Sequence, residues 1–242
     1  MHLYVVDLGL TPYDVAWALQ QRARAARVTS ALDQDVLILV EHPPVVTLGR
    51  STKPGNLLVT PEYLAACGIA VHDVERGGDV TIHEPGQLVA YPIMDLKRHT
   101  KDLHWYLRQV EESVIRALGT FGLESGRVAG RTGVWRDDAA GRRKLASIGV
   151  HAKDWVTSHG VALNVENDLS TFGHVVPCGI DGVEMTTVAR ECARASLPYP
   201  GAAAVRRAVV HAMAEVFGLT ARPMPPEELA RCSTEGMDTP TA

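Results

Sequence analysis

The sequence predicts a single α+β domain with a mixed or antiparallel sheet flanked by helices. Three observations lead to this prediction. The 242 residues suffice for one large domain that buries most of its surface. Segments with helical and strand patterns are intermixed, without the regular strand–helix alternation of Rossmann and barrel folds. Neither an internal repeat nor a clear linker divides the chain, so we place the domain at residues 1–220 and expect a partly ordered, proline-rich tail over 221–242.

The N-terminal elements follow from local signals. Residues 1–10 are largely apolar but are interrupted by Asp7 and have no basic residues in front, so they predict a strand and not a signal peptide. Thr11 and Pro12 supply a capping hydroxyl and a proline at the first helical position. We expect the helix that begins there to run to about Val28.

Short strands and one short helix follow. Apolar runs predict strands at 35–40 and 45–48, separated by the break at His42-Pro43-Pro44. The Thr60-Pro61-Glu62 start signal predicts a short helix that ends at Gly68. Residues 69–74 then form a strand.

The segment over residues 76–92 mixes glycine, histidine and proline with short β-prone stretches. We interpret it as a loop-rich connection between strands, where functional sites are often built. Apolar residues at helical spacing then predict a long amphipathic helix over 102–119. The remaining expected elements are strands near 133–136, 145–152 and 160–165 and helices at 184–195 and 202–217.

Composition excludes several classes of protein. Hydrophobic residues make up 46% and charged residues 21%, as in an ordinary globular enzyme. The net charge of −4 lacks the basic excess of a nucleic-acid surface, and no apolar run approaches the ~18 residues of a membrane span. Four cysteines are too few for a disulfide framework and have no paired metal spacing. We expect a cytoplasmic protein with reduced thiols and no nucleic-acid or membrane partner.

Cys178 is the candidate nucleophile. It lies between Pro177 and Gly179, a turn that can present a thiol and let a substrate approach the backbone. The residues alone leave open that it is an inert loop cysteine, which is the commoner case. The other cysteines fall in expected helices or in the tail: Cys67, Cys192 and Cys232.

Lys144 is the candidate proton-handling group. The chain has nineteen arginines and only five lysines, yet a lysine follows Arg142 and Arg143. An arginine cannot release its proton under working conditions, whereas a partly buried lysine near other cations can. A basic turn in solvent is the commoner explanation of the same residues, and sequence cannot place Lys144 beside Cys178.

Two further patterns allow chemistry without requiring it. The glycines that follow Arg76 could bring backbone amides to an anion or a carbonyl oxygen, or could form a bare turn. The interval from His174 to Cys178, with His83 and His159 elsewhere, allows a zinc site. Pro177 argues against a regular helix there and no second cysteine pairs with the first, so we expect no metal.

Taken together, ordered blocks of the chain resemble the lipoyl(octanoyl) transferase family over roughly residues 1–220. The most diagnostic block is RGGDVTIHEPGQLVAYP. The blocks are Glu41–Arg50, Arg76–Pro92, Arg143–Val150, Ser158–Val165 and Pro177–Ile180.

The resemblance implies a fold like the catalytic domain of biotin and lipoate protein ligases. It implies a monomeric enzyme without cofactor that takes octanoyl from acyl carrier protein, with Cys178 as nucleophile and Lys144 as its proton-handling partner. The acceptors would be lipoyl domains of 2-oxoacid dehydrogenases and the glycine cleavage H protein. The implied substrate-binding residues are Arg76, Gly77, Gly78, Asp79, Val80, Thr81, Ile82, His83, Ser147, Ile148, Gly149, Gly160, Val161 and Ala162.

Two residues depart from the family pattern. Ile82 replaces a usual aromatic residue and Glu84 a common glycine, so we expect an altered wall of the acyl pocket and a negative charge near the site. Because carrier proteins are acidic, we also expect a basic docking rim. Its candidates are Arg50, Lys53, Arg142 and Arg143.

Three alternative functions stay open. A lipoate or biotin protein ligase of similar fold would activate a free acid with ATP and would not need Cys178. An amidotransferase would move octanoyl between two lipoyl domains through a cysteine. A non-catalytic binder would form no acyl adduct.

Overall fold

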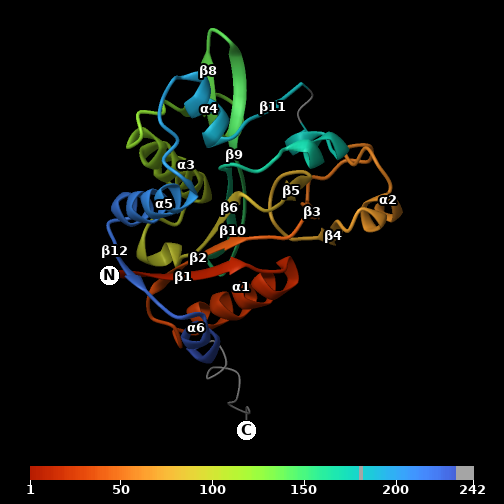
Figure 1. Cartoon of the computed structure of the whole chain (residues 1–242). Coiled ribbons are helices and arrows are strands. Elements are labelled where there is room, and N and C mark those ends of the chain that lie inside the picture. The colour runs from red at the N-terminus through yellow and green to blue at the C-terminus, as the bar shows by residue number, and fades with distance from the viewer. Residues whose placement is uncertain (180–181, 233–242) are drawn as a thin grey trace.

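A large mixed sheet lies at the centre of the molecule, with helices packed around it (Figure 1). The computed structural model describes residues 1–179 and 182–232, and among these nine strands form one mixed sheet. The strand order is β12-β1-β2-β6-β10-β9-β8-β7, and β11 pairs with β9. The strands are β1 (His2–Leu10), β2 (Asp35–Glu41), β6 (Gln87–Ile93), β7 (Gly126–Val128), β8 (Arg131–Asp138), β9 (Gly141–Lys153), β10 (Val156–Asn164), β11 (Glu184–Met185) and β12 (Thr220–Pro223).

Helices cover both faces of this sheet. Because side chains alternate along a strand, Leu37 and Leu39 of β2 enter a core shared with helices α3 (Leu103–Gly119) and α5 (Ala202–Val216). The neighbouring Ile38 enters the opposite core. That core is shared with α1 (Tyr13–Val28) and α6 (Pro226–Cys232), which lie on the other side in Figure 1. The short α4 (Val188–Arg194) adds two buried side chains to the first core.

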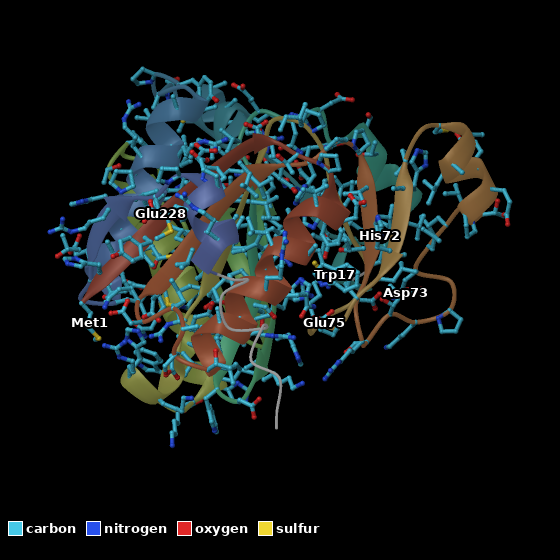
Figure 2. The ribbon with its side chains drawn as sticks, turned by 90° about the horizontal axis from the view of Figure 1, so that it is seen from below. Met1, Trp17, His72, Asp73, Glu75 and Glu228 are labelled. Carbon is cyan, nitrogen blue, oxygen red and sulfur yellow. The ribbon has the colours of Figure 1, made fainter. Side chains whose placement is uncertain are left out.

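A small sheet lies beside the main one and connects into it. Its order is β4-β3-β5, and α2 packs near β4 (Figure 1). A separate apolar cluster fills the small sheet. Tyr13 and Trp17 of α1 pack with Val45 and Val74 at its edge. Figure 2 shows Trp17, His72 and Glu75 gathered at this junction. The elements are β3 (Val45–Leu48), α2 (Pro61–Ala66), β4 (Ala70–Asp73) and β5 (Thr81–His83), and the chain also forms single 3₁₀ turns at Leu96–Arg98, Ser170–His174 and Pro177–Gly179.

Several expected elements appear where the sequence placed them, and the α+β architecture is confirmed. The predicted loop-rich character of residues 76–92 is wrong in its second half, because β6 is a central strand whose residues are all buried. It is covered on both faces, so it lacks the polar–apolar alternation that marks a half-exposed strand. The expected helix at 184–195 begins only at Val188, where the Thr187 hydroxyl accepts from the Arg190 amide; residues 184 and 185 pair with β9 instead.

The C-terminal segment expected to be a tail begins with ordered structure. Strand β12 pairs in parallel with β1, and α6 packs on α1 and β1. The domain boundary expected at residue 220 therefore falls at the start of a strand of the main sheet, and the domain extends at least to 232. Residues 233–242 of the expected tail lie outside the described residues. Within residues 1–179 and 182–232, none of the helices has the length and apolar character that a membrane crossing requires.

Candidate active site

A cavity of about 460 Å³ opens where the small sheet meets strands β9 and β10 of the main sheet. Its walls come from segments far apart in sequence: the loop before β5, the start of α3 and the β7–β8 turn. Both candidate residues, Lys144 and Cys178, line it. The expected substrate-binding residues that also line it are Arg76, Gly77, Gly78, Asp79, Val80, Thr81, His83, Ser147, Ile148, Gly149, Gly160, Val161 and Ala162.

Cys178 is held in a strained turn at this cavity. Its backbone is left-handed, with φ 58° and ψ 19°, which is uncommon for a residue other than glycine. The Cys178 amide donates to the carbonyl of Val80 at 3.2 Å, and the Gly179 amide donates to Val176 at 2.9 Å. These bonds fix the turn against the small sheet and point a partly exposed thiol into the cavity.

Gly179 has no space for a side chain. Its φ is +63°, and a Cβ there would lie 2.4 Å from the Asp79 carboxylate, which accepts a hydrogen bond from Asn56. We expect Gly179→Ala to displace the turn and slow alkylation of Cys178 about tenfold, with a loss of about 1–2 kcal/mol in the free energy of unfolding. Gly173→Ala is the matched control, because nothing lies within 4 Å of its Cβ position. Equal alkylation rates in the two variants would contradict this account.

Lys144 reaches the same point from β9. Its Nζ donates to Cys178 Sγ at 3.0 Å, and Ser147 Oγ lies 3.6 Å from the same sulfur. The lysine side chain is only 1% exposed, and among the described residues no carboxylate forms an ion pair with it. A buried ammonium requires a compensating partner. The Cys178 sulfur at 3.0 Å is the hydrogen-bond partner that the structure gives this nitrogen.

Close backbone approaches shape the rest of the wall. The Gly77 amide donates to the Val150 carbonyl at 2.8 Å, and a Cβ on Gly149 would lie 2.7 Å from the Gly77 carbonyl. The buried Arg76 guanidinium donates to the Thr47 carbonyl at 2.7 Å. The glycine loop is therefore pressed against β9, which brings its backbone amides to the cavity.

Two histidines beside the cavity are neutral. The Thr11 carbonyl can only accept, so His42 Nδ1 donates to it at 2.7 Å and Nε2 accepts from the Tyr91 hydroxyl at 2.8 Å. Burial lowers the pKa of His42 to about 4 and that of His83 to about 3. The side-chain nitrogen of Gln87 donates to the Ile82 carbonyl and to Asn164 Oδ1, so the Gln87 side-chain oxygen is free to accept. His83 Nδ1 therefore donates to that oxygen at 2.8 Å.

These histidines make stability depend on pH. Because His42 takes up a proton near pH 6.5 when unfolded but only near pH 4 when folded, its contribution is complete above 6.5 and is lost as the pH falls toward 4. We expect it to account for about 2 kcal/mol of the stability lost between pH 6.5 and 5. Urea unfolding of His42→Gln would then show a flatter pH dependence than the parent. The exposed His211→Gln is the control, and equal slopes for parent and His42→Gln would refute the assignment.

The structure does not bring together the residues of the zinc site that the sequence allowed. His174 packs against the Tyr63 ring and is absent from the cavity wall. Across the described part of the chain, no group of three or more His, Cys, Asp or Glu side chains is arranged to hold a metal ion.

The structure corrects the two positions that depart from the family pattern. Ile82 is fully buried in the apolar cluster of the small sheet and does not line the cavity, because neighbouring residues of β5 face opposite sides. The Glu84 carboxylate is buried and accepts from Asn167, the Leu169 amide and Thr171, so it fixes a loop and adds no charge to the cavity.

The expected docking rim also changes. Arg143 is 1% exposed and its guanidinium is paired with Glu191 and Asp138, so it is not available to a partner protein. Arg142 is exposed but paired with Asp137 at 2.8 Å. Arg50 and Lys53 are exposed on the loop that follows β3, next to the small sheet.

Sequence reasoning missed part of the cavity wall. Leu103 and Leu107 stand one turn apart on α3 and look like any apolar pair of a core-facing helix. Tyr13 and the 130–132 turn gave no signal at all. His159 was not among the expected substrate-binding residues, yet it lines the cavity with a left-handed φ of 57°.

Comparison with known proteins finds a family model and curated relatives that match most of this chain. The model of the lipoyl protein ligase A/B catalytic domain matches residues 12–214. An octanoyltransferase of Thermosynechococcus vestitus is 45% identical over 216 residues, covering 89% of this chain and 90% of the relative. One from Chloroflexus aurantiacus is 46% identical over 222 residues, covering 91% and 96%.

Solved structures share the fold at low identity. A lipoate-protein ligase A bound with ATP superposes with a TM-score of 0.73 at 18% identity, covering 99% of this chain and 95% of that one. A putative lipoate protein ligase from T. acidophilum with bound lipoic acid gives 0.71 at 19% identity, covering 98% and 96%. These structures establish the arrangement of helices and strands, and the chemistry has to be argued from this chain's own site.

Proposed function

The chain belongs to the lipoyl protein ligase A/B catalytic domain family and to its octanoyltransferases, and from that premise we propose that Cys178 carries the octanoyl group during transfer. The donor is octanoyl acyl carrier protein and the acceptor is a lysine of a lipoyl domain. The observation that carries the proposal is the 3.0 Å contact between Lys144 Nζ and Cys178 Sγ at a cavity of about 460 Å³.

The first half-reaction exchanges one thioester for another. The Cys178 thiolate attacks the carbonyl carbon of the donor and forms a tetrahedral oxyanion. When this collapses, the bond to the carrier sulfur breaks, and the leaving thiolate takes a proton from the Lys144 ammonium. The exchange is near thermoneutral, so it requires no ATP.

The second half-reaction forms an amide. The neutral amine of the acceptor lysine attacks the acyl-enzyme carbonyl and gives a proton to the now neutral Lys144. Collapse of the second tetrahedral intermediate breaks the bond to Cys178 and restores the ammonium–thiolate pair. Lys144 thus donates one proton and accepts one in each cycle.

The oxyanion requires fixed hydrogen-bond donors. In the glycine loop, the Gly77 amide is engaged by Val150 and the Val80 amide by the Asp79 carboxylate at 2.7 Å. Gly78 and Asp79 line the same cavity, and their amides are the candidates that remain in this loop.

A transfer assay tests the proposal. The protein is incubated with octanoyl carrier protein and a lipoyl domain in the absence of ATP, and the mass of the lipoyl domain is followed. We expect it to gain one octanoyl group. Transfer only from free octanoate with ATP would indicate a ligase, and transfer only from an octanoylated lipoyl domain would indicate an amidotransferase.

We further propose that Arg50 and Lys53 contribute to docking of the acidic carrier protein. Charge reversal of both is expected to raise the KM for octanoyl carrier protein about tenfold, with little change in kcat, because rim charges act mainly on association. Arg207→Glu on the distant α5 is the control, since Arg207 is exposed and α5 lies across the main sheet from the small one (Figure 1). A KM that is unchanged in the double variant would remove this docking site.

A further inference from the structure

The Lys144 ammonium lies over the indole ring of Trp135. Its Nζ is 4.9 Å from the ring centroid, within the range of a cation–π contact. Both side chains are 1% exposed, so water does not weaken the attraction. Tryptophan offers the strongest π face of the aromatic residues, and among the described residues the ammonium makes no carboxylate ion pair.

A bulge between β8 and β9 creates this contact. Val134 pairs with Ala146, so an uninterrupted antiparallel register would place Trp135 opposite Leu145. The register shifts at this point, and Trp135 pairs with Lys144 instead. Bulges re-aim side chains in this way, and here the shift brings the indole and the ammonium to the same face.

Gly133 leaves no free space beside the lysine stem. Its φ is +128°, and a Cβ there would lie 2.7 Å from Lys144 Cε and 2.5 Å from the Ala146 carbonyl. The Gly133 amide donates to the buried Glu111 carboxylate at 2.9 Å, which anchors this part of β8 to α3. Gly133 and Trp135, two residues apart on β8, therefore both restrict the Lys144 side chain.

We propose that Trp135 is the positioning residue for Lys144: its ring face holds the ammonium against the Cys178 sulfur. The ring does not line the cavity and acts only through the lysine. The effect of Trp135 on turnover rests on the proposed octanoyl transfer. The effect of Trp135 on the Cys178 thiol is independent of that proposal, because an ammonium held beside Cys178 favours the thiolate whatever the substrate.

The pH profile of Cys178 alkylation tests the proposal without any acyl donor. Alkylation is followed by peptide mass, because Cys67 is also exposed. We expect Trp135→Leu to move the midpoint of the profile to higher pH by about half a unit to one unit, and Trp135→Phe to retain most of the parent behaviour. Octanoyl transfer should fall about tenfold in the leucine variant, in line with the same shift.

A second background separates positioning from general loss of packing. In Lys144→Met, replacing Trp135 with leucine should leave the alkylation profile unchanged, since no ammonium remains to be held. Tyr106→Leu removes another fully buried aromatic side chain of the main core and should lower stability without moving the profile. The proposal is overturned if Trp135→Leu leaves the profile unmoved, or moves it equally with and without Lys144. A missing octanoyl transfer activity in the parent would instead count against the proposed function alone.

Discussion

Cys178→Ser is expected to lower kcat/KM for octanoyl transfer roughly 10⁴-fold or more, to the level of the uncatalysed background. Serine differs from cysteine by one atom and can adopt the same left-handed turn, so the fold should be retained. Its hydroxyl, however, is far less acidic than a thiol, and the ammonium at 3.0 Å cannot make it an alkoxide at neutral pH.

The comparison is made with purified protein at matched concentration, with thermal unfolding as the check on structure. Cys67→Ser, at the residue that follows the small helix α2, is the matched control and should retain full activity because that thiol lies outside the cavity wall. If the Cys178→Ser enzyme kept more than a tenth of the parent rate, covalent catalysis by this residue would be ruled out.

Lys144→Arg is expected to lower octanoyl transfer about 10²–10³-fold although it keeps the positive charge. The guanidinium does not release its proton at neutral pH, so it can neither protonate the leaving carrier thiolate nor accept the proton of the attacking amine. Its planar head is also larger than an ammonium, and Gly133 and the Trp135 ring restrict the side chain at this position.

Cys178 alkylation and octanoyl transfer, measured together, distinguish a loss of proton transfer from a loss of positive charge or a misplaced side chain at position 144. Alkylation of Cys178 at neutral pH should stay within a few-fold of the parent in Lys144→Arg, because a cation is still present, while transfer falls. Lys144→Met should lose both. Normal turnover in the arginine variant would exclude proton transfer by Lys144, and a loss of alkylation equal to that of the methionine variant would point to misplacement instead.

The sequence predicted the fold best where one local signal determines the element. Pro12 stands directly before α1, although the predicted Thr11 cap is wrong because the Thr11 hydroxyl donates to the Leu8 carbonyl instead, and the apolar spacing of residues 102–119 marks α3. Strand β6 was missed because it is buried on both faces and contains Pro92, which pairs with Leu37 of β2. Neither periodicity nor propensity distinguishes such a strand from a loop rich in glycine and proline.

The site could be predicted only in part. Cys178 and Lys144 were singled out by residue type and by family resemblance, whereas their contact depends on the β11–β9 pairing and on the turn at Gly179, which are tertiary features. Burial of Arg143 depends on Glu191, contributed by α4, and Trp135 comes to face Lys144 through a one-residue register shift. No local pattern in the sequence encodes either event.

The most direct measurement is the intact mass of the protein after incubation with octanoyl carrier protein alone, followed by peptide mapping. Without an acceptor the acyl-enzyme should accumulate, so we expect one octanoyl group per chain, on the peptide that contains Cys178, removed by hydroxylamine and by addition of a lipoyl domain. An unmodified protein that still octanoylates the lipoyl domain, or an octanoyl group mapped to any other residue, would contradict the central role of the Cys178 sulfur.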